Sequence, residues 1–124
     1  GGAGAPSSGS SFAGTTGGAP GAGTPQTATE EYNGTAWTGG GALGTARQRG
    51  CGTGASQAAA ICFGGSVPPV TGNTEIYDGS SWSEQSNMNS GKASGMGFGL
   101  STSAVSTGGE TSTASYTSTT ETWD

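Results

Sequence analysis

The side chains that could carry out chemistry are few, and the sequence contains no histidine. Without histidine the chain cannot form a Ser–His hydrolase, the usual proton shuttle at neutral pH or most zinc sites. Its two cysteines, Cys51 and Cys62, are not spaced like a metal knuckle or a redox pair. We predict two semi-buried thiols on one hairpin rather than a cross-strand disulfide. We expect no cofactor and no metal, and we predict that the chain is not an enzyme.

The carboxylates do not form a pattern that is typical of acid–base catalysis. Glu30 and Glu31 are adjacent, so on a strand they point to opposite sides of the sheet and cannot act together. Glu30, Glu75 and Glu121 occupy one position of a repeat that is defined below. A recurring position favours a structural or solvated role over the paired carboxylates of a glycosidase.

Glycine-rich segments and repeated aromatic residues are the other candidates for a binding site. Gly50-Cys51-Gly52 and Gly97-Phe98-Gly99 lack the Lys-Ser/Thr and the helix that a phosphate-binding loop requires. Four aromatic residues could stack on sugar rings: Tyr32, Trp37, Tyr77 and Trp82. Because they recur at equivalent positions, packing between neighbouring repeat units is the favoured interpretation.

Composition excludes several classes of protein. The chain of 124 residues has 27 glycines, 29% hydrophobic residues and 9% charged residues, too little apolar surface for a helical core. Disorder is the alternative, but the low charge and the regular placement of aromatic residues argue against it. Because the net charge is -5 and only three residues are basic, we expect that nucleic acid is not a partner. No segment is long and apolar enough to suggest membrane insertion.

A tandem repeat organises the chain. The segment 29–37, TEEYNGTAW, reappears as TEIYDGSSW at 74–82, 45 residues later, and a third copy begins with TETWD at 120–124. We align a second marker, FGG at 63–65, with TGG at 107–109 and with FAG at 12–14. Thr45-Ala46-Arg47 likewise matches Ser90-Gly91-Lys92. The repeat units are therefore expected at about 1–44, 45–89 and 90–124, within one domain spanning 1–124.

Each unit is predicted to contain four short antiparallel strands. In the second unit the first strand starts near Arg47, the chain turns through 54–56, and an apolar second strand ends at Phe63. The third strand covers 74–77, and the fourth carries Trp82. Asp78-Gly79, like Asn33-Gly34, predicts a two-residue type I′ turn with Gly at positive φ. No segment has helical periodicity, so the fold class is all-β.

A period of about 45 residues with four strands per unit is typical of a β-propeller blade. The Gly-Gly end of a strand, the Glu-Xaa-Tyr-Asp/Asn segment, the tryptophan and the Ala-Arg resemble the kelch repeat, and more closely the Gly/Thr-rich kelch-like repeats of bacteriophage tail and virion proteins. The five-residue spacing from Tyr77 to Trp82 is shorter than in typical kelch blades. The resemblance implies an incomplete propeller, because propellers have roughly four to eight blades. We therefore expect copies of the chain, other proteins of a large assembly, or a longer chain to complete it.

The same resemblance implies a function. It indicates a non-catalytic virion structural or tail-associated binding module of a bacteriophage, with possible attachment to host-surface glycan. Its partners would be other virion proteins or copies of itself, and its location the virion surface or the extracellular space. A secreted lectin-like β-propeller is the first alternative. A Gly-rich extracellular structural or ice-binding protein is the second, although the threonines are scattered among turn and strand positions.

Overall fold

The computed structural model describes residues 12–15, 24–67, 69–112 and 115–124, and for 12–15 the backbone alone. Every regular element in these ranges is a β-strand, so the prediction of an all-β chain without helix is confirmed for them. The strands are β1 Phe12–Thr15, β2 Thr29–Tyr32, β3 Trp37–Gly39, β4 Cys51–Ser56, β5 Ala59–Phe63, β6 Thr74–Tyr77, β7 Trp82–Gln85, β8 Met96–Leu100, β9 Ser103–Thr107, β10 Glu110–Ser112, β11 Ser115–Tyr116 and β12 Thr120–Trp123.

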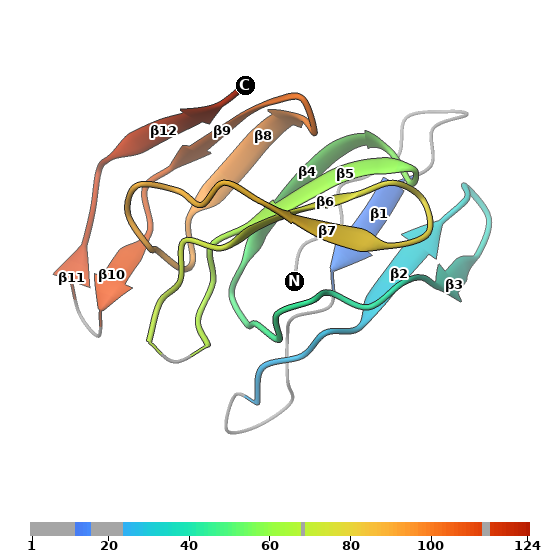
Figure 1. Ribbon diagram of the computed structural model, residues 1–124, viewed down its shortest axis with the longest axis horizontal. Coiled ribbons are helices and arrows are strands. Elements are labelled where there is room, and N and C mark those ends of the chain that lie inside the picture. Colours follow the sequence, from blue (N-terminus) through green and yellow to red (C-terminus); the bar gives the residue numbers. More distant parts are fainter. Residues whose placement is uncertain (1–11, 16–23, 68, 113–114) are drawn as a thin grey trace.

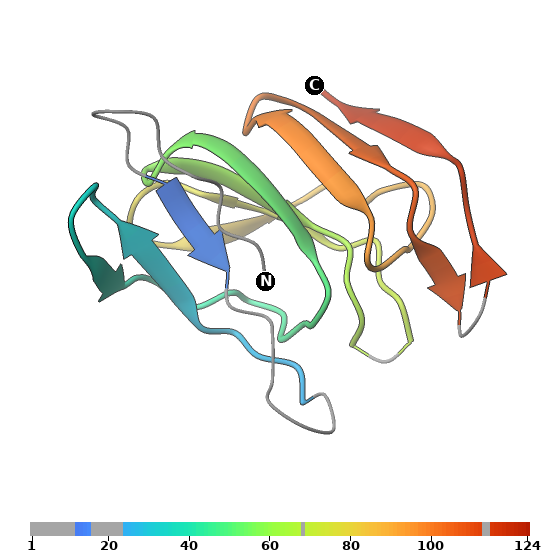
Figure 2. The same cartoon turned by 180° about the vertical axis from the view of Figure 1, so that it is seen from behind.

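Three antiparallel sheets follow one another along the chain. The first sheet has the order β1-β2-β3, the second β4-β5-β6-β7 and the third β12-β9-β8. The ribbon β10-β11 extends the connection between β9 and β12. The second sheet lies between the other two, and this arrangement is visible from both sides of the molecule (Figures 1 and 2). The described strands thus give one four-stranded sheet flanked by two sheets of three strands.

The turns that join β2 to β3 and β6 to β7 differ from the predicted type I′ turns. Gly34 and Gly79 do have positive φ, 98° and 97°, but Asn33 and Asp78 do not. Tyr77 pairs with Trp82, so each loop has four residues rather than two. The reason is a side-chain cap: Asp78 Oδ1 accepts hydrogen bonds from the backbone N–H groups of residues 80 and 81, both at 2.8 Å. Asn33 caps its own loop in the same way.

The predicted position of the double-glycine marker is correct in the second and third units and wrong in the first. Gly64 and Gly65 have φ of 68° and 105°, and Gly108 and Gly109 have 64° and 111°. In both units this left-handed pair ends a strand. In the first unit, FAG at 12–14 lies inside β1, and Thr15 pairs with Thr29 as Phe63 pairs with Thr74. The first unit is longer than the second between this strand and Thr29, and the glycine-rich segment 17–21, which the sequence predicts to be a surface-loop insertion, lies outside the described residues.

The first hairpin of the second sheet also differs in its boundaries. β4 begins at Cys51 rather than near Arg47, and the chain reverses at residues 57–58 rather than at 54–56. A register shift between Gly54 and Ser56 accommodates the extra residue. The third and fourth predicted strands match β6 and β7.

The core consists of two small clusters, one on each side of the second sheet. Ala60 and Tyr77 pack with Trp82 on the side of the first sheet. Ile61 and Phe63 pack with Ala104 of β9 on the other side, together with Cys51, Ile76, Met88 and Trp123. Because neighbouring residues on a strand point to opposite faces, the second sheet is buried on both sides. The second sheet is therefore stabilised by packing against the first sheet on one side and the third sheet on the other.

Candidate functional site

A buried ion pair in the second unit holds the segment that leads into β4 against β6. Glu75 and Arg47 are almost completely buried and form an ion pair. The carboxylate also accepts hydrogen bonds from the backbone N–H groups of Gly44 at 2.6 Å and Thr45 at 3.4 Å. Arg47 Nη1 donates to the carbonyl oxygens of residues 64 and 73. This site is a structural clamp that fixes the segment entering β4.

The same clamp occurs in the third unit. Glu121 accepts hydrogen bonds from the backbone N–H groups of Asn89 at 2.6 Å and Ser90 at 3.2 Å. Lys92 lies with its Nζ 3.9 Å from Glu121 and replaces Arg47 of the preceding unit. These contacts give Glu75 and Glu121 the structural role that was predicted for their repeat position. Glu30, at the same position in the first unit, is exposed.

Sequence reasoning did not find the partners of these glutamates. Arg47 and Lys92 are 45 residues apart, and Glu75 and Glu121 are 46 apart. The available signal was that a basic residue recurs at one position of the repeat and an acidic residue at another. The spacing alone does not show that the two places meet, because Arg47 and Glu75 are separated by two strands and a loop.

The aromatic pair of the second unit contacts the first sheet. The ring centroids of Tyr77 and Trp82 are 5.0 Å apart, and Trp82 Nε1 donates to Thr29 Oγ1 at 3.0 Å. The Tyr77 hydroxyl donates to Glu31 and accepts from the backbone N–H of Gly41 at 3.3 Å. The predicted packing of these aromatic residues between neighbouring units is confirmed for this pair.

Burial also explains the electrostatics of Tyr77. Removal from water raises the pKa of its phenol, and the hydrogen bond donated to Glu31 raises it further. With 1% of the residue exposed, Tyr77 presents no ring face to a sugar. Among the four candidate stacking residues, Trp37 is the most accessible, at 47%. It forms with Tyr32 a pair whose ring centroids are 5.1 Å apart, equivalent to Tyr77 and Trp82.

The second and third sheets meet along β4 and β8. Cys51 Sγ donates to the carbonyl oxygen of Gly95 at 2.6 Å, and Thr53 Oγ1 donates to that of Gly99 at 2.8 Å. No disulfide joins Cys51 to Cys62, as predicted. Burial raises the pKa of the Cys51 thiol, while the positive charge of Lys92 acts in the opposite direction. A protonated thiol is therefore available to donate at neutral pH, and the nucleophilic thiolate is suppressed.

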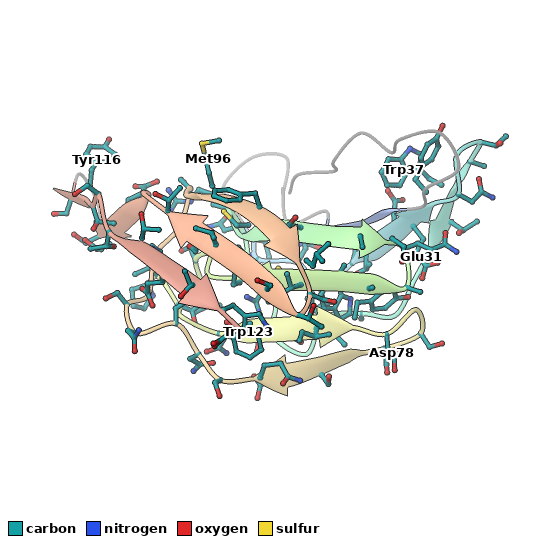
Figure 3. All side chains as sticks on the ribbon, turned by 90° about the horizontal axis from the view of Figure 1, so that it is seen from above. Glu31, Trp37, Asp78, Met96, Tyr116 and Trp123 are labelled. Atoms are coloured by element: carbon teal, nitrogen blue, oxygen red, sulfur yellow. The ribbon has the colours of Figure 1, made fainter. Side chains whose placement is uncertain are left out.

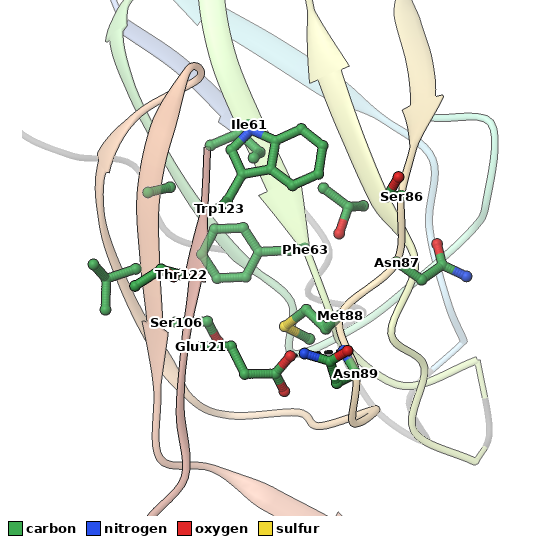
Figure 4. A pocket seen from close by; sticks show the side chains of 13 residues that line it. Ile61, Phe63, Ser86, Asn87, Met88, Asn89, Ser106, Glu121, Thr122 and Trp123 are labelled. Carbon is green, nitrogen blue, oxygen red and sulfur yellow. Dashed lines mark hydrogen bonds between the residues drawn. The ribbon is translucent and has the colours of Figure 1, made fainter.

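A small pocket lies between these two sheets (Figure 4). Phe63, Met88 and Trp123 form its apolar wall, and Asn89 and Glu121 form its polar end. Its volume is about 60 Å³, far below the ~300–1,000 Å³ of ordinary small-molecule sites. The pocket can admit a few water molecules but not a sugar ring.

The described residues provide no group of three or more His, Cys, Asp or Glu side chains that could hold a metal ion. Among the same residues, no helix is present that could cross a membrane. What the geometry of these residues offers is a set of contacts, within and between sheets, that recurs from one repeat unit to the next.

Comparison with known proteins gives a similarity in fold. No protein-family model and no curated protein matches the sequence. Among solved structures, the chain is similar to one described as "Structure of YjhT", with a TM-score of 0.60 and 14% sequence identity. The match covers 76% of this chain and 34% of that chain. The present chain therefore spans about a third of the length of that structure, and the similarity concerns the fold alone.

Proposed function

We propose that the chain is a series of kelch-like β-propeller blades that serves as a non-catalytic structural or binding module on a bacteriophage virion. The observation that carries the proposal is the repetition of one set of contacts. The Glu75 clamp and the Glu121 clamp are equivalent, and the Tyr32–Trp37 and Tyr77–Trp82 pairs have the same geometry. Units that repeat both sequence and contacts are built to stack on further units.

Several chemically capable side chains are already used in structural contacts. Arg47, Glu75 and Lys92 are buried in the clamps, and the Cys51 thiol binds a backbone carbonyl. These contacts support a role in recognition or assembly rather than in catalysis. The virion location rests on the resemblance of the repeat to kelch-like virion proteins.

The genes that flank the coding sequence test the virion assignment. The proposal predicts neighbouring genes for capsid or tail proteins. A gene placed among bacterial secretion or metabolic genes, with no phage genes nearby, would contradict it.

A lectin-like module is the second candidate, because Trp37 and Tyr116 are exposed aromatic residues at 47% and 82%. A glycan array probed with the protein tests this candidate. Binding that is lost in Trp37→Ala or Tyr116→Ala would favour it, and an array without any signal would count against it.

A further inference from the structure

The clamps of the second and third units differ at two positions. The first position is the base, because Lys92 stands in the place of Arg47. The second is the residue that pairs with the clamp glutamate: Ser106 lies opposite Glu121, where the second sheet has Cys62. The third clamp therefore combines a shorter base with a more polar neighbour.

The shorter base leaves donors of its ammonium group unused. Arg47 donates from two nitrogens, to two carbonyl oxygens and to its glutamate. Lys92 is 3% exposed, and its direct hydrogen bond within the described part of the chain is to the carbonyl oxygen of Thr119 at 3.3 Å. Its Nζ lies 3.9 Å from Oε1 of Glu121, which is too far for a hydrogen bond. An ammonium has three N–H donors, and a polar contact longer than about 3.5 Å is a place for a bridging water molecule.

The hydroxyl of Ser106 is a second buried polar group that needs a partner. Ser106 is 6% exposed, and no described residue forms a hydrogen bond with its hydroxyl. Ser106 and Glu121 both line the pocket between the second and third sheets (Figure 4). Trp123, on the same face of β12 as Glu121, points toward the second sheet (Figure 3). Buried polar groups are normally hydrogen-bonded to protein or to ordered water. The pocket volume of about 60 Å³ exceeds the roughly 10–15 Å³ that one water molecule needs.

The charges of the third clamp favour a neutral molecule over an ion. Lys92 and Glu121 carry opposite charges 3.9 Å apart, so the ammonium would repel a cation and the carboxylate an anion. Water both donates and accepts hydrogen bonds, which suits a donor-only ammonium, an acceptor-only carboxylate and a hydroxyl. Phe63 and Met88 close the other side of the pocket with apolar atoms, so a larger polar molecule would lack partners there. Water is the ligand that fits.

We propose that the third clamp binds an ordered water molecule that accepts a hydrogen bond from Lys92 Nζ and donates to Glu121 Oε1 and Ser106 Oγ. This water takes the place of the guanidinium N–H groups with which Arg47 reaches Glu75 directly. It keeps the third clamp closed although its base is shorter. The inference stands on the contacts of the clamps and does not depend on the proposed function.

Crystal structures that resolve ordered solvent, for the wild type and two variants, test the proposal. The wild type should contain a water molecule within hydrogen-bond distance of all three groups. Lys92→Arg should lose this water, because the longer guanidinium reaches Glu121 as Arg47 reaches Glu75 in the second unit. Ser103→Ala is the matched control, an exposed serine on the same strand as Ser106, and it should retain the water.

Oxygen-17 relaxation dispersion, which detects long-lived internal water molecules, tests the same site in solution. Lys92→Arg should lose the contribution of one water, and Ser106→Ala should reduce it, because the water then keeps two of its three partners. Ser103→Ala should match the wild type, and circular dichroism of each variant must show the wild-type β spectrum. An unchanged dispersion in either of the first two variants would overturn the proposal, as would an ion or no ordered solvent at this place in the wild-type crystal. None of these results would alter the glycan-array or flanking-gene tests of the proposed function.

Discussion

Phe63 of β5 lies over the backbone of Gly97 on β8, so closely that a Cβ added to Gly97 would overlap the Phe63 ring. The ring is buried, with 4% exposed, in the cluster between the second and third sheets. The absence of a side chain at Gly97 is therefore what allows these sheets to approach. The glycine at this position therefore has a packing function.

Gly97→Ala should thus lower the free energy of unfolding by about 1–3 kcal/mol, the usual cost of overpacking a core. Gly39→Ala is the matched control, because a Cβ at Gly39 meets nothing within 4 Å. Urea denaturation of both variants measures the difference. Equal stability of the two variants would show that Phe63 does not occupy this place.

Breaking the Arg47–Glu75 clamp should be more costly. Glu75→Gln would leave the Arg47 guanidinium buried without its counter-charge, at a cost of about 3–5 kcal/mol. The control is Glu110→Gln, which removes the charge from the 2.6 Å pair with Arg49, whose side chain is 49% exposed. That change should cost about 0–1 kcal/mol. A smaller effect for Glu75→Gln than for Glu110→Gln, in denaturant titrations, would contradict the clamp.

The Asp78 cap predicts a dependence on acid pH. Hydrogen bonds from the backbone N–H groups of Ser81 and Ser80 hold the pKa of Asp78 below its ordinary value of 3.8. A depressed pKa in the folded state stabilises the protein above the unfolded pKa, and this contribution is lost as pH falls through the folded value. Asp78→Asn keeps the acceptor oxygen, as Asn33 does naturally in the first unit, but does not titrate.

Thermal unfolding of wild type and Asp78→Asn between pH 6 and pH 2 measures this effect. The melting temperature of the wild type should fall relative to that of the variant as the pH drops below 3.8. A constant difference in melting temperature over this range would show that the Asp78 cap does not contribute.

Adding a side chain should destabilise the protein more at Gly79 than at Gly34, the two glycines of the hairpin loops. Gly34 and Gly79 have nearly the same positive φ, so valine at either position should cost about 1 kcal/mol or more in backbone strain. A Cβ at Gly79 would also lie 3.0 Å from the Ala58 Cβ, whereas Gly34 has open space. Gly79→Val should therefore melt at a lower temperature than Gly34→Val. The reverse order would argue against the observed loop geometry.

The sequence repeat made much of this fold predictable, and the predictions that were wrong failed for physical reasons. β6 and β7 were found because their aromatic residues and turn glycine recur. The turn type was wrong because the side chain of Asp78, rather than a left-handed backbone at that residue, closes the loop. The FAG marker was misaligned because residue identity was matched, whereas pairing with Tyr32 sets the register of β1.

The candidate site was predictable in part for a related reason. The recurrence of Tyr77 and Trp82 indicated packing between units, and the structure supplied the partners, Thr29 and Glu31. Single residues of a repeat reveal that a position matters, but the contact between two positions depends on how far one sheet is rotated against the next. That rotation is a property of the packed sheets and leaves no short-range signal in the sequence.

Exchange of the three indole N–H protons with solvent, followed by NMR, tests most directly whether the first and second sheets contact one another through Trp82. Trp82 and Trp123 donate to Thr29 and to the carbonyl of Ser101, so both indole N–H groups should be protected from exchange. Trp37 is 47% exposed, so its indole N–H should exchange faster than the other two. Exchange of Trp82 as fast as that of Trp37 would contradict the packing of the second sheet against the first.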